Sequence, residues 1–215
     1  SSTPAPKPSS TPAPKPSGTP APKPTGTPAP AVVKLTAPAI KASTSWNSCT
    51  LRWNRVKNSQ NYILYRKTNS GKYVKLKTLN ANTTSYKDTK ITIGNKYSYV
   101  IRASRKTSSG YIYSPTSKAV TVKPNLLRPS TKLKTLKGKQ ILSWKKVPGA
   151  TGYVLYQKKG NSSFKKVKTV SARNLSYTFK TSKNATYSYR VVPYRTINRK
   201  AKTGPASAVK TVKAR

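Results

Sequence analysis

The sequence predicts an all-β protein in which two tandem antiparallel β-sandwiches follow an extended proline-rich segment. The first observation is an internal repeat: segment 51–66 returns as segment 142–157, and Trp144 follows Trp53 by 91 residues. The second is the alternation of apolar and polar residues in short runs bounded by turn-forming residues, which is typical of half-buried strands. About seven such runs occur in each copy, and no segment has the apolar spacing of a helix.

Residues 1–33 are the predicted extended segment. Within it, residues 2–31 repeat an octapeptide built around Thr-Pro-Ala-Pro-Lys-Pro. Proline at every second or third position fixes φ and removes amide donors, which predicts a polyproline II-like chain. We therefore interpret residues 1–33 as a linker or stalk, in preference to a PxxP ligand for an SH3-like groove. Lys7, Lys15 and Lys23 add sparse positive charge along it.

Two units follow, at 34–124 and 125–215, and at roughly 90 residues each is long enough for a modest core. A proline near the first strand of each unit, Pro38 or Pro129, protects a sheet edge. In the first unit, the further expected strands are 49–53, 62–66, 73–78, 84–86, 97–103 and 119–122. Their counterparts in the second unit are 142–144, 153–157, 164–169, 175–177, 187–193 and 209–212.

These residues resemble the fibronectin type III family, in the form common in secreted bacterial proteins. The resemblance rests on Trp53 in the second strand, on the run 62–65 in the third, and on a corner before the sixth formed by Ile91, Gly94 and Tyr97. The second copy has no glycine at this corner. The resemblance covers residues 34–215 and implies immunoglobulin-like sandwiches. It implies no single function, because the family has adhesion, spacing and binding roles alike, and the integrin-binding Arg-Gly-Asp triplet of some members is absent.

The balance of charge is abnormal. The chain has 44 Lys and Arg residues against one acidic residue, Asp88, and no His, for a formal charge of +43. Self-repulsion at this charge opposes the compact state, so we expect a polyanionic partner or surface rather than charge kept for solubility alone.

The same composition excludes most chemistry. General acid–base catalysis and metal binding need carboxylates, His or an oriented nucleophile, so we predict no enzyme activity, no catalytic residues, no metal site and no cofactor. We interpret Asp88 as a turn residue, and the single Cys49 as a small buried side chain rather than a reactive thiol. No apolar run reaches the roughly 18 residues of a membrane span.

Alternation also assigns side chains to faces of the sheets. If Tyr62 and Leu64 point into the first sandwich, then Tyr65, Val100 and Arg102 point outward. On the next strand, lysines should alternate outward around an inward apolar residue, Leu76 or Val167. The predicted binding residues of the outer faces are Tyr65, Lys75, Lys77 and Arg102, and Tyr156, Lys166, Lys168 and Arg190. Interstrand loops are expected to add Arg105, Lys106, Arg195, Arg199, Lys200 and Lys202.

Such a face has two interpretations. In one, the tyrosine ring offers a stacking or sugar-packing surface while the cations meet phosphate or sulfate. In the other, the tyrosine is a cross-strand residue packed under lysine stems.

The leading functional hypothesis is a non-catalytic binding module of a secreted or cell-surface protein. Its partner would be an anionic polymer: cell-wall teichoic acid, an acidic or sulfated glycan, or nucleic acid. One alternative is a structural spacer that separates another domain from the cell wall. Another is an intracellular nucleic-acid-binding protein, which the absence of a recognised reader motif disfavours. The sequence makes no prediction of oligomeric state.

Overall fold

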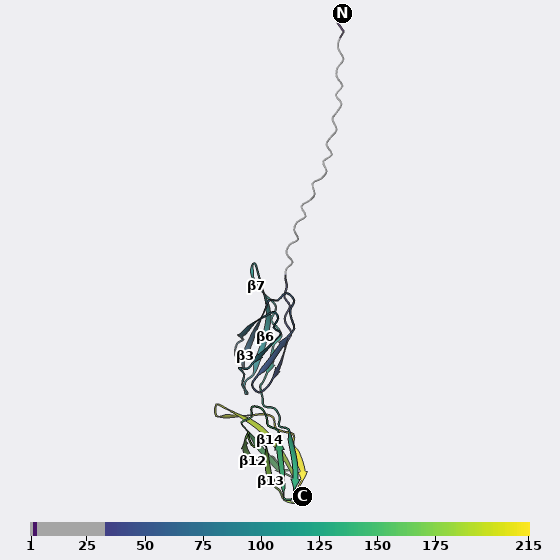
Figure 1. Ribbon diagram of the computed structural model, residues 1–215, viewed down its shortest axis with the longest axis vertical. Helices are drawn as coiled ribbons and strands as arrows, with labels where there is room; N and C mark the ends of the chain where they lie inside the picture. The colour runs from purple at the N-terminus through teal and green to yellow at the C-terminus, as the bar shows by residue number, and fades with distance from the viewer. Residues whose placement is uncertain (1, 4–32) are drawn as a thin grey trace. The chain divides into compact units, whose positions relative to one another are not determined.

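The computed structural model describes residues 2–3 and 33–215 of the chain. The proline-rich array, residues 4–32, lies outside the described residues. Residues 33–215 form one compact unit of sixteen β-strands, without a helix among them (Figure 1). This confirms the predicted all-β class. None of the described residues belongs to a helix that could span a membrane.

Sandwich 1 consists of the first eight strands, arranged as two antiparallel sheets. The smaller sheet has the order β1-β2-β5, and the larger has the order β4-β3-β6, with β7 and β8 both paired to β6. The strands are β1 (Ile40–Thr44), β2 (Cys49–Trp53), β3 (Asn61–Thr68), β4 (Val74–Asn80), β5 (Ser85–Asp88), β6 (Tyr97–Thr107), β7 (Gly110–Tyr113) and β8 (Val120–Val122).

Sandwich 2 repeats this arrangement. Its smaller sheet is β13-β10-β9, and its larger sheet is β12-β11-β14, with β15 and β16 both paired to β14. The strands are β9 (Thr131–Leu136), β10 (Lys139–Trp144), β11 (Gly152–Lys159), β12 (Lys165–Ser171), β13 (Ser176–Lys180), β14 (Thr186–Ile197), β15 (Lys200–Thr203) and β16 (Lys210–Lys213). The prediction of two antiparallel sandwiches is confirmed.

Eight strands appear where about seven were expected, because the last strand of each sandwich is interrupted by proline. Pro115 lies between β7 and β8 and has no amide hydrogen to donate to β6. Near the break, a serine hydroxyl takes the place of a strand carbonyl as the acceptor for a backbone amide of the neighbouring strand. The amide of Ile101 donates to Ser117 Oγ at 3.0 Å, and the amide of Val191 donates to Ser207 Oγ at 3.0 Å in sandwich 2.

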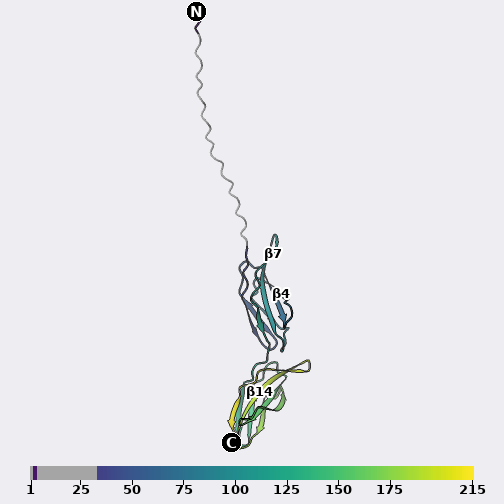
Figure 2. The same ribbon diagram turned by 180° about the vertical axis from the view of Figure 1, so that it is seen from behind.

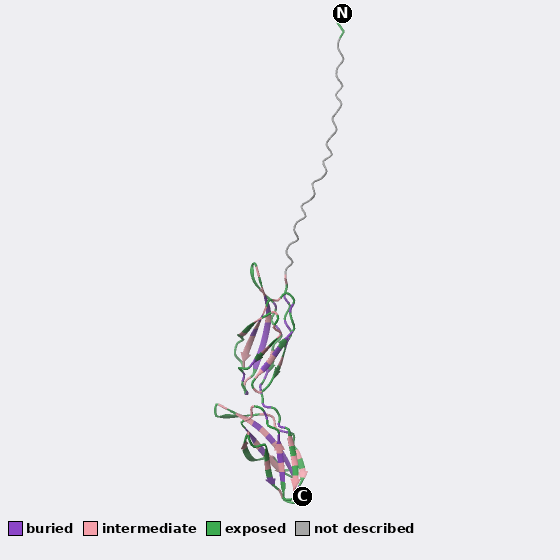
Figure 3. Ribbon diagram, viewed as in Figure 1, coloured by how far each residue is buried: buried purple, intermediate pink, exposed green. Residues whose placement is uncertain are grey.

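Each core is built around a tryptophan of the second strand and a tyrosine of the third. The ring centroids of Trp53 and Tyr62 lie 5.7 Å apart, and those of Trp144 and Tyr153 lie 5.4 Å apart, both edge to face. Buried positions alternate with intermediate or exposed ones along β2 and over the first half of β3 (Figure 3). Cys49 is fully buried, as predicted, and burial raises the pKa of its thiol to about 11.

The predicted corner before the sixth strand is present in both sandwiches. The hydroxyl of Tyr97 accepts a hydrogen bond from a backbone amide of the preceding loop at 3.0 Å, and that of Tyr187 accepts the equivalent bond at 3.1 Å. The turn needs one residue with positive φ, which is Gly94 at +97° in sandwich 1. Asn184, at +63°, replaces it in sandwich 2, because asparagine tolerates the left-handed region.

Asp88 organises the polar part of the first core. It ends β5 and is 1% exposed, and its side chain accepts the amide two residues further on, so the turn interpretation describes only part of its role. One carboxylate oxygen accepts hydrogen bonds from the Tyr99 hydroxyl and from the Arg66 guanidinium, both at 2.9 Å, and the other accepts the Lys90 amide at 2.9 Å. Burial and the carboxylate raise the pKa of Tyr99 far above its usual range. The buried Tyr99 hydroxyl needs an acceptor, and this requirement explains why Asp88 is buried in the core rather than exposed in a turn.

In sandwich 2 the equivalent tyrosine hydroxyl donates its hydrogen bond to a neutral acceptor. Phe179 follows Asp88 by 91 residues, so the carboxylate is missing. Instead the Tyr189 hydroxyl donates to Gln140 Oε1, and Gln140 is fully buried. The amide of Gln157 donates back to Tyr189 at 3.3 Å. Burial raises the pKa of Tyr189 to about 12.

Candidate functional site

The outer face of the larger sheet in sandwich 1 contains the predicted tyrosine and arginine. Tyr62 and Leu64 of β3 are fully buried, whereas Tyr65 is half-buried on the opposite face, which confirms the predicted phase of this strand. Arg102 of β6 is half-buried on the same face as Tyr65. Val100 also belongs to this face but is only 9% exposed, because it lies opposite Tyr65 and forms the floor of a hollow.

A β-bulge changes the predicted positions of the lysines on β4. The register passes from Leu64 opposite Lys77 to Tyr65 opposite Lys75, which leaves Leu76 as an extra residue. Lys75 therefore shares the outer face with Tyr65. Lys77 lies opposite the core residue Leu64 but is exposed at the sheet edge, and Leu76 between the two lysines packs against the core as predicted.

The same bulge occurs in sandwich 2. Tyr156 lies opposite Lys166 on the outer face, and the buried Leu155 lies opposite Lys168. Val167 is the extra residue and is 39% exposed, so the prediction that it points inward is wrong, unlike that for Leu76. One predicted outer-face lysine remains beside the tyrosine in each sandwich.

The Arg102 guanidinium lies over two aromatic rings. Its central carbon is 4.0 Å from the ring centroid of Tyr113 and 5.6 Å from that of Tyr65. The Nε atom is buried without a hydrogen-bond partner, whereas the side chain as a whole is half-buried, so the terminal nitrogens are the part left open to solvent. The rings hold the guanidinium by cation–π attraction and leave its outer edge open to an external acceptor.

Arg190 has the equivalent arrangement in sandwich 2. It lies directly opposite Tyr156 in the strand register, and its central carbon is 5.0 Å from the Tyr156 centroid and 4.4 Å from that of Phe164. Its Nε is also buried without a partner. Sequence reasoning missed the second ring of each pair. Phe164 follows Tyr73 by 91 residues, so the repeat itself marks this aromatic position, whereas Tyr113 is brought close only by the pairing of β7 with β6.

No carboxylate compensates these two guanidinium groups. Asp88 is the one acidic side chain of the sequence, and its carboxylate is buried against Arg66 at 2.9 Å. A guanidinium fork matches the paired oxygens of phosphate, sulfate or carboxylate. An external oxyanion can therefore bind either arginine without displacing an acidic side chain.

The cations that were predicted in loops lie mostly in strands that continue as hairpins (Figure 2). Arg105 and Lys106 belong to β6, and the Arg105 guanidinium donates to the Asn58 carbonyl at 3.1 Å. The loop prediction is wrong here because the two-residue turn at 108–109 lets β6 pair with β7. Lys106 is exposed.

In sandwich 2 the corresponding turn consists of Asn198 and Arg199, with φ of +48° and +61°. Two consecutive residues with positive φ form a tight hairpin turn that matches the twist of the strands. Only Arg199 of the four predicted loop cations is therefore in a loop, and Lys200 and Lys202 belong to β15. All three side chains are exposed.

Arg195 is engaged within the protein rather than free. It lies in β14, and its guanidinium donates to the Gly149 carbonyl at 2.8 Å. The guanidinium carbon is 4.5 Å from the ring of Trp46, whose indole covers Gly149 so closely that a Cβ there would overlap it.

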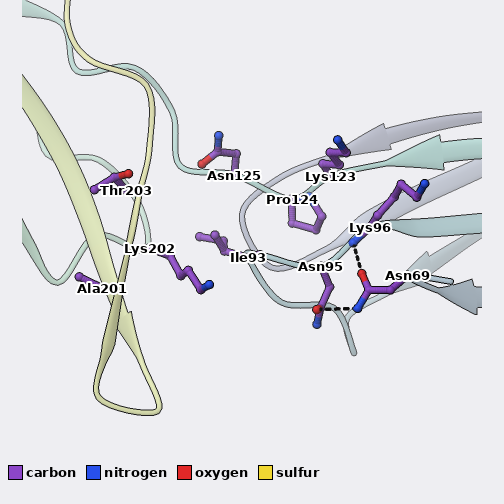
Figure 4. Close-up of a pocket in the computed structure, with 11 residues that line it drawn as sticks. Asn69, Ile93, Asn95, Lys96, Lys123, Pro124, Asn125, Ala201, Lys202 and Thr203 are labelled. Carbon is purple, nitrogen blue, oxygen red and sulfur yellow. Dashed lines mark hydrogen bonds between the residues drawn. The ribbon is translucent and has the colours of Figure 1, made fainter. Parts of the chain in front are cut away.

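A basic hollow of about 450 Å³ is lined by three lysines, Lys96, Lys123 and the Lys202 of β15 (Figure 4). The Asn69 side chain shapes one wall, since its carbonyl oxygen accepts the Lys96 amide at 2.9 Å and its amide donates to the side chain of Asn95 at 3.1 Å. The other lining residues are Ile93, Gly94, Pro124, Asn125, Ala201 and Thr203. This hollow adds positive charge without an acidic residue.

Metal ligation has little support in this part of the chain. The described residues contain no group of three or more His, Cys, Asp or Glu side chains. Cys49 and Asp88 are direct neighbours across β2 and β5, but both are buried, and Asp88 already accepts three hydrogen bonds.

Comparisons with known proteins concern the fold. Neither the protein-family models nor the curated proteins match this sequence. Among solved structures, a two-domain fibronectin type III segment of chicken tenascin matches 82% of this chain and 99% of its own, at 16% identity and a TM-score of 0.49. The FN1–FN3 domains of chicken CNTN1 match 84% of this chain and 66% of their own, at 18% identity and a TM-score of 0.38.

Likeness at this level carries no functional argument. The fold is assigned from the strand order. A three-stranded sheet of order β1-β2-β5 packs with a sheet of order β4-β3-β6-β8, and strands β9–β16 repeat this arrangement. Residues 33–215 are two tandem sandwiches of the fibronectin type III fold.

Proposed function

We propose that the protein is a non-catalytic, highly basic binding module of a secreted or cell-surface protein, and that it attaches to an anionic polymer. The observation that carries the proposal is the pair Arg102 and Arg190. Both are held on aromatic rings with their outer edges open, in a chain whose only acidic side chain is buried elsewhere.

The contact is distributed over many cations rather than concentrated in one pocket. Lys75 and Lys166 flank the two arginines across the sheet, and exposed hairpin cations such as Lys106 and Arg199 extend the positive surface. Binding of this kind gains most of its free energy by releasing counterions from the polymer. Teichoic acid, acidic or sulfated glycans and nucleic acid all provide suitable oxyanions, and a cell-wall or extracellular location fits the polymers of that setting.

Salt dependence tests the proposal. Log affinity for teichoic acid, heparin and DNA should fall steeply and linearly with log salt concentration. Replacing both Arg102 and Arg190 with Gln should reduce the slope by about one unit per lost oxyanion contact. The matched control replaces Lys132 and Lys134 with Gln, since these exposed lysines belong to the smaller sheet.

Two outcomes would contradict the proposal. If none of the three polymers binds at low salt, the chain is a structural spacer. If the Lys132 and Lys134 control reduces the slope as much as the arginine variant does, the aromatic-held arginines have no special part in binding.

A further inference from the structure

A hollow of about 380 Å³ opens on the outer face of sandwich 1, beside Arg102. Tyr65 and Tyr73 provide aromatic walls, Val100 the floor, and Thr116 a further side. Tyr73 is 39% exposed and Thr116 is exposed, so the hollow is open to solvent. Lys75, opposite Tyr65, and Lys67, whose ammonium lies 5.0 Å from the Tyr73 ring centroid, add positive charge at its border.

In sandwich 2 a side chain of the protein itself fills the position that corresponds to this hollow. Tyr156 and Phe164 correspond to Tyr65 and Tyr73 in the repeat. The residue opposite Tyr156 is Arg190, and its flat guanidinium lies over both rings, at 5.0 and 4.4 Å. The second ring pair is therefore already occupied by the protein.

In sandwich 1 the residue opposite Tyr65 is Val100, which is too short to reach across the rings. The arginine lies two residues along β6, at Arg102, where its central carbon is 4.0 Å from the Tyr113 centroid and 5.6 Å from that of Tyr65, so it borders the Tyr65 wall. One open space between aromatic walls thus remains, with a guanidinium that has a free outer edge at its border.

We propose that this hollow binds one sugar ring of an acidic glycan. The apolar C–H face of the ring packs on Tyr65 and Tyr73 above Val100, and its acidic substituent pairs with Arg102 and Lys75. The inference rests on the proposed polyanion binding and narrows its ligand. Sandwich 1 selects for a ring that carries a negative charge, and sandwich 2 contributes charge alone.

The number of open ring sites favours a glycan over single-stranded nucleic acid. Proteins that bind single strands present aromatic side chains to successive bases along a basic groove. Here the repeat could have provided a second open pair, but Arg190 closes it. A single site fits recognition of one sugar residue within a polymer that is otherwise held by its charge.

The test exchanges the two residues that distinguish the sandwiches. Val100→Arg closes the hollow with the side chain that sandwich 2 uses, and Arg190→Val opens the equivalent position. Calorimetric titration of the full chain uses three probes at fixed ionic strength: a hyaluronan hexasaccharide, which has rings and carboxylates; inorganic polyphosphate, which has charge but no ring; and oligo-dT, which has bases.

The expected result separates shape from charge. Val100→Arg should weaken hyaluronan binding by about tenfold or more, the factor that loss of one ring-stacking contact corresponds to. It should do so although it adds a positive charge, and polyphosphate affinity should stay equal or rise. Arg190→Val should increase hyaluronan stoichiometry from one to two although it removes a charge.

Three results would overturn the inference or its basis. Unchanged or stronger hyaluronan binding by Val100→Arg means that the hollow holds no sugar. Weaker oligo-dT binding together with unchanged hyaluronan binding assigns the hollow to a base instead. Failure of the wild-type chain to bind any probe at low salt refutes polyanion binding itself. If Val100→Arg does not fold, Tyr73→Ala, which removes an exposed wall, tests the same site and should weaken hyaluronan binding selectively.

Discussion

Replacing Asp88 with Ala should destabilise sandwich 1 selectively. The substitution removes the acceptor of the Tyr99 hydroxyl, which is fully buried and cannot turn to water. A buried donor left without a partner costs about 1–3 kcal/mol. The Arg66 bond at 2.9 Å adds to the loss, although the Arg66 side chain is 24% exposed and can regain water. The Lys90 amide also loses its acceptor, so we expect a total of about 3–5 kcal/mol.

The single cysteine provides a domain-specific assay. Cys49 is fully buried in sandwich 1, and sandwich 2 has no cysteine, so modification of the thiol reports the opening of sandwich 1 alone. A loss of about 3–5 kcal/mol should increase the labelling rate under native conditions by two orders of magnitude or more, and lower the urea midpoint of sandwich 1.

Gln140→Ala is the matched control, because it removes the neutral acceptor of the Tyr189 hydroxyl in sandwich 2. It should destabilise sandwich 2 by about 1–3 kcal/mol and leave Cys49 labelling unchanged. The reasoning is refuted if Asp88→Ala labels no faster than the wild type, or if Gln140→Ala accelerates labelling equally.

Three further predictions follow from the packing. Because the folded pKa of Cys49 is raised to about 11, its contribution is fully present below the unfolded value near 9 and is lost as pH rises through 11; unfolding of the wild type and of Cys49→Ala between pH 8 and 11 should show a larger alkaline loss in the wild type, since the raised pKa values of Tyr99 and Tyr189 act in both variants. Gly149→Ala should destabilise the chain, since a Cβ there would overlap Trp46; in a Trp46→Ala background, urea unfolding should show a smaller cost, that of the positive φ, and an equal cost in both backgrounds would disprove the overlap. Trp53→Ala should unfold sandwich 1 by removing about 3–5 kcal/mol while sandwich 2 persists, and a wild-type melting curve would contradict the position of Trp53 in the core.

The strands and the core could be predicted from the sequence because both depend on local alternation and on the repeat. Tyr62, Leu64 and Trp53 were assigned to the core from a period of two residues, which side chains on a pleated strand must follow. Asn184 shows the limit of motif reasoning. The second corner lacks the glycine, but it keeps the turn with another residue that tolerates positive φ.

The errors concern features that depend on the partner strand. Residues 74–77 alternate regularly in the sequence, so nothing local marks the bulge, which arises only when β4 pairs with β3. The role of Asp88 in the core was missed for a similar reason. The hydroxyl that donates to its carboxylate belongs to Tyr99, eleven residues further along the chain and in another sheet. The second ring beside Arg102 also comes from a separate strand.

The bulged strands β4 and β12 bear on whether copies of the chain can pair edge to edge. Each is the outermost strand of its sheet, and an outermost strand with free amides and carbonyls is a template for pairing with another chain. A bulge together with lysines such as Lys77 and Lys168 prevents such pairing by shape and by repulsion. Part of the positive charge therefore acts between copies of the chain. It keeps sandwiches apart at high local concentration, such as the proposed polyanion would produce, and neutral residues at these two positions would favour sheet-to-sheet aggregation.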